Sequence, residues 1–286
     1  MKALLSELAR IFKKAPLGIT IVLAMDIAEI IFLSLSPFVI GLCIDGILDQ
    51  NYFWFHALIF LQVLLIAIRV ANKFLDTRIY EQVIESESNS YYENAIRTNA
   101  NDSQISSRLN LVDEIPNFFE IELVQIIDMF GGIAISLVYI FITSGLPLLL
   151  VAIIISSLVY ISTKKWHREI AGNNIKLQDY DETKEKIILG RDKQHFNCFT
   201  KIILNLRIMN SDLDAKAYLM TDILQAGLLI FAMAFTIHIG NYTSGQLFSI
   251  ITYIIMLNER VCEINEVRVR IYDLMDSISR LERNDK

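Results

Sequence analysis

Six apolar stretches, each about as long as a helix that crosses a bilayer, dominate the sequence and limit what it can fold into. They occupy residues 17–48, 52–75, 123–143, 146–163, 219–239 and 246–265. A transmembrane helix needs roughly 20 predominantly apolar residues. Hydrophobic residues make up 53% of the chain, which is too apolar for a soluble protein of 286 residues. The sequence therefore predicts an all-α membrane protein, a single domain with six long transmembrane helices.

The linkers between these stretches are alternately very short and very long. Only Ser144 and Gly145 separate the third stretch from the fourth, and the first pair and the last pair are also joined by short turns. We expect three helical hairpins. The long sections 76–122 and 164–218 are polar and almost free of helix breakers, and structureless loops of that length are uncommon. They predict helical extensions outside the membrane, and residues 266–286 predict a C-terminal helix.

The basic residues predict the orientation of the chain. Of the 26 lysines and arginines, 4 precede the first stretch, 5 lie in residues 69–108, 11 in residues 164–216 and 6 from residue 260 onwards, which leaves none for the three short turns. Cytoplasmic loops carry the excess of Lys and Arg. We therefore expect a multi-pass protein of the cell (inner) membrane, with both termini and both extensions in the cytoplasm.

The sixth stretch brings charge into the membrane. Its apolar part ends at Leu257, so a full crossing must include Asn258, Glu259 and Arg260. Ionised groups at membrane depth face other protein or water. These three residues are therefore predicted to line a polar cavity that could receive a substrate.

Two acids in the first stretch are the other main candidates for a site. Asp26 and Glu29 are three residues apart, so they share a helix face, and they lie roughly 13 and 18 Å past Leu17. That depth is near the middle of the bilayer. A carboxylate there binds a cation, holds a proton, or pairs with a basic residue, for which Arg69 and Arg260 are the candidates.

Further candidates are secondary. Glu259, Glu263, Glu266 and Arg270 recur at helical spacing, and they form either part of a cavity wall or a salt-bridged face in which Glu263 and Glu266 meet Arg270, Arg268 or a neighbouring helix. Asp128 in the third stretch is an intramembrane acid. His238 near the outer end of the fifth is either a hydrogen-bonded wall residue or a pH sensor.

Other kinds of site find no support in the sequence. The three cysteines are far apart and have no ligand spacing, so no metal site is predicted. Neither a catalytic triad nor a nucleic-acid-binding patch is visible, because the basic residues are spread along the membrane edges.

Four segments resemble the transmembrane domain of the six-helix (type I) ABC exporters. They are SQISSRLNLVDEIPNFFEIELVQII (103–127), KIILNLRIMNSDLDA (201–215), NYTSGQLFSIITYIIML (241–257) and DLMDSISRLER (273–283). The resemblance covers essentially the whole chain, and hydrophobic spacing and loop lengths carry more of it than any invariant motif. It implies a homodimer around a central cavity.

The sequence departs from that family in its ATPase. It contains no GxxxxGK[ST] run and no LSGGQ-like signature, so it is not expected to be an enzyme or to bind a cofactor. The resemblance implies a separate ATPase subunit that carries ATP and Mg²⁺. That partner would dock near residues Asn99 to Ser107 and Lys186 to Cys198.

The leading hypothesis is a membrane subunit that moves an amphiphilic, and in view of the acids a cationic, solute through the cavity. Two alternatives remain open at this point. One is an ATP-independent channel on the same dimer, and the other is a membrane scaffold or sensor whose extensions bind a regulatory partner.

Overall fold

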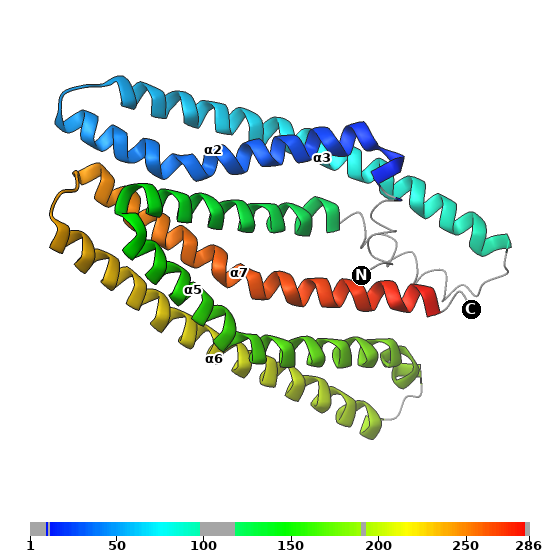
Figure 1. Cartoon of the computed structure of the whole chain (residues 1–286). Helices are drawn as coiled ribbons and strands as arrows, with labels where there is room; N and C mark the ends of the chain where they lie inside the picture. The colour runs from blue at the N-terminus through cyan, green and yellow to red at the C-terminus, as the bar shows by residue number, and fades with distance from the viewer. Residues whose placement is uncertain (1–9, 11, 98–117, 190–192, 284–286) are drawn as a thin grey trace.

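The structure is a bundle of very long helices. The computed structural model describes residues 10, 12–97, 118–189 and 193–283. Its elements are α2 (Pro16–Leu48), α3 (Phe53–Arg97), the π-helical turn η1 (Phe118–Glu122), α5 (Leu123–Leu189), α6 (Lys193–Ile239) and α7 (Ser244–Arg283). In Figure 1 the turns that join α2 to α3 and α6 to α7 lie at one end, and the start of α2 and the end of α7 lie at the other.

The helices are longer than a bilayer is thick. The 45 residues of α3 span about 68 Å, against roughly 30 Å for the hydrocarbon core. The predicted extensions are therefore helical where they are described, as continuations of α3, α5 and α6. The predicted docking segment Asn99–Ser107 lies outside the described residues, as do residues 190–192 of the second one.

The predicted hairpin of the third and fourth spans is confirmed. Helix α5 reverses at Gly145, whose backbone (φ 75°, ψ −168°) is not helical. A positive φ is open to glycine because it has no Cβ atom. Pro147 follows, at the start of the second arm, where the absence of its N–H is tolerated. Figure 1 shows the two arms of α5 diverging from this turn.

The last two predicted spans pair differently from expectation. α6 and α7 meet at the short turn after Ile239, but α7 then packs more extensively against α5 than against α6. The reason is the apolar face of α7. Ile250, Ile254, Leu257 and Val261 are buried in a core that is shared with both arms of α5 and with α6. In contrast, α2 and α3 stay together along their length, as predicted (Figure 1).

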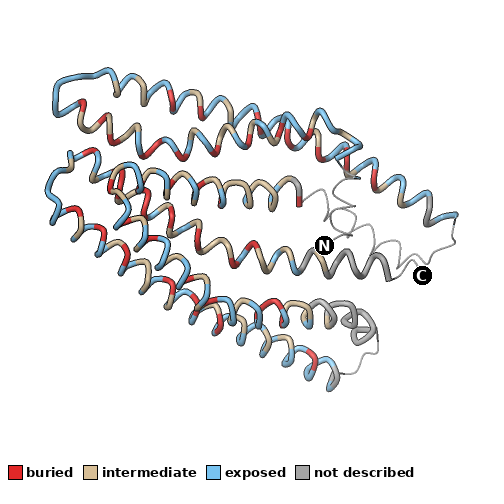
Figure 2. Tube along the Cα trace, viewed as in Figure 1, coloured by how far each residue is buried: buried red, intermediate tan, exposed pale blue. Residues whose placement is uncertain are grey.

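Four of the described helices are long and apolar enough to cross a membrane: α2, α3, α5 and α6. Because α5 is a hairpin, these helices include five of the six predicted spans. α7 is not among them, since Asn258, Glu259 and Arg260 interrupt its apolar run. Large apolar side chains such as Phe60 and Ile237 are exposed. Figure 2 shows exposed positions recurring along the helices, which is expected where lipid covers a helix.

Candidate functional site

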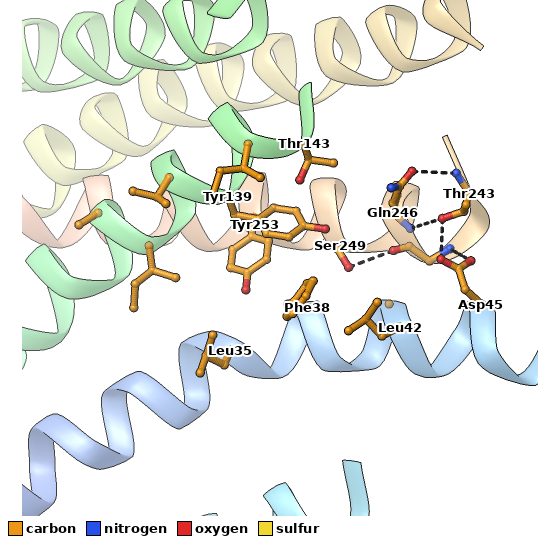
Figure 3. Close-up of a pocket in the computed structure, with 16 residues that line it drawn as sticks. Leu35, Phe38, Leu42, Asp45, Tyr139, Thr143, Thr243, Gln246, Ser249 and Tyr253 are labelled. Atoms are coloured by element: carbon orange, nitrogen blue, oxygen red, sulfur yellow. Dashed lines mark hydrogen bonds between the residues drawn. The ribbon is translucent and has the colours of Figure 1, made fainter. Parts of the chain in front are cut away.

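The first candidate region lies at the end of the bundle where α7 begins, which is the predicted outer end. Thr243 and Gln246 form a capping box: the Thr243 N–H donates to Gln246 Oε1 (3.1 Å), and the Gln246 N–H donates to Thr243 Oγ1 (3.2 Å). Asp45 of α2 completes this cap. Its carboxylate accepts the Thr243 hydroxyl (2.5 Å) and the Gly245 N–H (2.7 Å), so a negative charge lies at the positive end of the α7 dipole (Figure 3).

Below this cap, α2 and α7 touch backbone to backbone. A Cβ atom on Gly245 would collide with the carbonyl oxygen of Gly41. The Ser249 hydroxyl lies 2.9 Å from the carbonyl oxygens of Pro37 and Gly245, and the Tyr253 hydroxyl donates to the Ser34 carbonyl (2.8 Å). These contacts run along the half of α2 that contains Pro37. The helix continues through that proline as a single element.

A cavity of about 730 Å³ opens beside these contacts (Figure 3). Three helices line it. They are α2 with Leu35, Phe38, Gly41, Leu42 and Asp45; the first arm of α5 with Ala134, Ile135, Val138, Tyr139, Ile142 and Thr143; and α7 with Thr243, Gly245, Gln246, Ser249 and Tyr253. We call this cavity the outer pocket.

Aromatic rings form one wall of the outer pocket. Tyr139 stacks on Tyr253 with ring centroids 4.2 Å apart, and Phe38 meets Tyr139 edge-on at 5.9 Å. The polar groups of the pocket gather at its other side, at the α7 cap (Figure 3). The pocket therefore has an apolar, aromatic body and a polar end.

The two acids that the sequence singled out lie elsewhere, where the first half of α2 packs against the middle of α3. Glu29 is paired with Arg69 (2.8 Å), which was one of its two candidate partners. Asp26 is buried and accepts a hydrogen bond from the Asn72 amide. Neither acid is paired with Arg260. Both line a small cavity of about 150 Å³, which Asp128 of α5 also borders.

Arg260 is the centre of a separate ion cluster. Its guanidinium lies 2.7 Å from Asp128 and 2.9 Å from Glu263, and the three side chains are only 18–34% exposed. It packs over Gly132, where a Cβ atom would come within 3.0 Å of the arginine stem. A residue predicted to line a polar cavity thus joins the first arm of α5 to α7.

The remaining candidates are scattered. Glu259 and His238 are exposed, and the backbone carbonyl of Asn258 accepts a hydrogen bond from Gln225 of α6 (2.8 Å). The predicted partners of Glu263 were wrong. Arg260 takes that place, while Arg268 lies over the Tyr160 ring and Arg270 donates to Gln125 (2.6 Å).

The pairing of α2 with α3 also tests how deep in the membrane Asp26 was predicted to lie. Asp26 lies level with Asn72, and Lys14 lies beside Glu87 (2.8 Å). If the second span ends at residue 75, Asp26 is about 5 Å inside the membrane edge and not at mid-bilayer. The predicted inner boundaries of spans one and two therefore disagree by about two helical turns.

Comparison with known proteins decides the family. The model of the ABC transporter transmembrane region matches residues 5–245. The chain belongs to this family. No curated protein matches it closely enough to count as a relative. The family match confirms the resemblance seen in the sequence, it spans α2, α3, α5 and α6, and it ends at the start of α7.

In this ABC transmembrane region the outer pocket is the feature that sequence reasoning missed. Most of its lining is ordinary apolar residues from three helices, which carry no local signal. Two signals were present in the sequence. Thr243 and Gln246 have capping-box spacing, and Asp45 is an acid at the outer end of a span.

The ABC transmembrane region offers little for other chemistry. Among its described residues, no group of three or more His, Cys, Asp or Glu is arranged to hold a metal ion. The match is to a membrane region, and no ATPase domain is found in the chain.

Proposed function

We propose that this chain is the membrane subunit of an ABC exporter-like transporter that moves an amphiphilic solute by alternating access. A separate ATPase subunit would supply the energy, and two copies of the chain would enclose the central path. Membership of the ABC transmembrane family supports a transport role. The single observation that carries the choice of solute is the outer pocket.

The size and lining of the outer pocket suit an amphiphile. Small-molecule sites are typically concave, roughly 300–1,000 Å³ in volume and mostly apolar, with a few polar groups that orient the ligand. This pocket is about 730 Å³. The Tyr139 and Tyr253 rings offer flat apolar surface to the body of a solute. Gln246 and Thr243 offer polar contacts to its head group.

The preference for a cationic solute has less support than the sequence suggested. Glu29, Asp128 and Glu263 are each within ion-pair distance of an arginine. Asp45 is engaged with the start of α7. Because these acids are engaged by ion pairs or hydrogen bonds inside the chain, we propose a neutral or zwitterionic amphiphile as the principal substrate.

The partners follow from the same proposal. Six spans make half of a path of twelve, so a homodimer is proposed. The C-terminal end of α5 (to Leu189) and the start of α6 (from Lys193), at the end of the bundle opposite the α2–α3 and α6–α7 turns, are the described part of the proposed docking surface for the ATPase (Figure 1). ATP and Mg²⁺ would be bound by that partner.

Photolabelling tests the substrate site. The purified chain in lipid nanodiscs is labelled with a long-chain alkyl amide that carries a diazirine, and the labelled peptides are identified by mass spectrometry. Labelling should concentrate on the outer halves of α2, α5 and α7 and compete with unlabelled amide. Tyr139→Ala should lower it severalfold, whereas Phe60→Ala, at an exposed aromatic of α3, should not.

Two results would contradict the proposal. Labelling that is spread over the lipid-facing surface, without competition, would remove the outer pocket as a site. A steady ion current through the purified protein in planar bilayers without nucleotide would instead favour a channel.

A further inference from the structure

A buried polar row runs along α3 where that helix packs against α2. Asn72, Asp76 and Tyr80 are four residues apart, so they lie on one helix face. Their exposed fractions are 7%, 9% and 0%, and that of Asp26, which faces Asn72 from α2, is 8%. Apolar side chains continue the same contact, because Tyr80 packs with Ile19 and Val22. The row is therefore buried, and of its members only Asp26 borders the small cavity of about 150 Å³.

Each member of this row has an unsatisfied polar atom. Among the described residues, no hydrogen-bond partner reaches Oδ2 of Asp26, Oδ1 of Asn72, Oδ1 of Asp76 or the hydroxyl oxygen of Tyr80. The Tyr80 hydroxyl also lies close enough to Asp76 and Asp26 to interact electrostatically with their carboxylates. Buried polar groups nearly always have a partner. Four such atoms in one row, three of them oxygens that can only accept while the acids are ionised, indicate a missing hydrogen.

The charge balance gives the same result. Asp26, Asp76 and Glu120 are three carboxylates, and Lys73 is paired with two of them, 3.3 Å from both Asp76 and Glu120. With all three acids ionised, the group would carry three negative charges and one positive charge. A buried carboxylate without a counter-ion costs several kcal/mol, and protonation removes that cost.

The other charged groups around the row do not supply the missing charge. Arg69 of α3 is occupied by Glu29 of α2, Arg260 of α7 is occupied by Asp128 of α5 and by Glu263, and Glu122 of η1 is a further acid. All of these belong to the described part of the chain.

We propose that Asp26, Asn72, Asp76 and Tyr80 form a proton-binding site between α2 and α3, in which the Asp26 and Asp76 carboxylates hold one proton. The proton bonds to a free carboxylate oxygen, so one acid becomes neutral and gains a donor for a neighbouring oxygen. The net charge of the group falls from −2 to −1. A metal ion is a poorer occupant, because no three of the described His, Cys, Asp and Glu residues are arranged around a common point.

Infrared spectroscopy tests the proposal without a transport assay. The full chain in nanodiscs, with ¹³C-labelled aspartate carboxyl groups, is titrated from mildly acidic to mildly alkaline pH. A protonated aspartic acid has a carbonyl stretch that an ionised one lacks. We expect this band at neutral pH, where a solvated aspartate is fully ionised, and we expect it to disappear as the pH rises.

Substitutions identify the aspartates that give rise to the band. Asp26→Asn and Asp76→Asn should each reduce it by at least half or abolish it, and Tyr80→Phe should change the pH at which it disappears. Asp49→Asn is the control, since this aspartate is exposed and lies just after α2, far from the row. It should leave the aspartate band unchanged.

The wild-type titration alone can overturn the proposal, even if a variant fails to fold. Absence of a protonated aspartate band at neutral pH would do so. A band that persists in both Asn variants, or one that responds to sodium concentration at fixed pH, would also do so. None of these results bears on the outer pocket, so this inference and the proposed function fail separately.

Discussion

Gly41 of α2 and Gly245 of α7 meet so closely that a single added methyl group on Gly245 would strike the Gly41 carbonyl oxygen. This contact brings Asp45 within hydrogen-bonding distance of the first turn of α7. The outer pocket lies beside it. Two residues without side chains therefore determine how α2 and α7 are placed at one end of the bundle.

Gly245→Ala should destabilise the protein and reduce the outer pocket. The new Cβ atom would also lie 2.6 Å from Oδ2 of Asp45, so the helices must separate. Overpacking typically costs roughly 1 to 3 kcal/mol, occasionally more. Thermal unfolding in nanodiscs measures the effect. Gly227→Ala is the control, because nothing lies within 4 Å of its Cβ position, and it should be neutral or slightly stabilising.

Asp45→Ala should lower stability by about 0.5 to 2 kcal/mol, the usual cost of losing a helix cap. The substitution removes the two carboxylate oxygens that accept the Thr243 hydroxyl and the Gly245 N–H. Hydrogen exchange of the amides at residues 244–247 should quicken, since their protection depends on the cap. Asp49→Ala, at an exposed acid just after α2, should leave this exchange as it is in the wild type. Equal exchange in both variants would argue against the role of Asp45.

Arg260→Ala should cost more than removal of an exposed arginine. It leaves Asp128 and Glu263 without a counter-charge at 22% and 34% exposure. We expect a loss of roughly 1 to 3 kcal/mol, less than for a fully buried pair because the site is partly solvated. In a double-mutant cycle with Asp128→Ala, the two losses should be strongly non-additive. Arg270→Ala, at an exposed position, serves as the comparison.

Asp26→Asn together with Glu29→Gln should change transport while leaving the proposed dimer intact. Glu29→Gln releases Arg69, and Asp26→Asn keeps the shape of a side chain that Asn72 contacts. ATP-dependent uptake into inverted vesicles measures the first effect, and light scattering coupled to size-exclusion chromatography measures the second. Unchanged uptake at an unchanged oligomeric state would reject any role for this pair in transport.

The fold could be predicted wherever the sequence contains residues that form turns or end helices. Gly145 predicts a reversal because a two-residue linker between apolar runs forces a turn, and the structure places a positive φ there. The ion pair of Glu29 with Arg69 was one of the predicted alternatives. It follows from two neighbouring spans that carry opposite charges.

The candidate site was less predictable, for a physical reason. The pairing of Arg260 with Asp128 depends on how α5 and α7 are rotated against each other, and no local signal specifies that rotation. The outer pocket depends in the same way on the relative rotation of three helices, which no local signal specifies. Tyr139 and Tyr253 stack only because α5 and α7 cross where they do. The spacing of Asn72, Asp76 and Tyr80 in the sequence places them on one helix face. Their burial, however, depends on how α2 packs against α3.

The bond between Asp45 and the start of α7 has a mechanical consequence. It attaches α2 to α7 at Asp45, close to the C-terminal end of α2, which runs from Pro16 to Leu48. α3 is held with α2. A rotation of about 5° around Asp45 would move Pro16 by about 4 Å, given the helical rise over that distance. The hairpin of α2 and α3 is therefore a lever whose fulcrum lies at Asp45 and whose travel is greatest at the opposite end of the bundle.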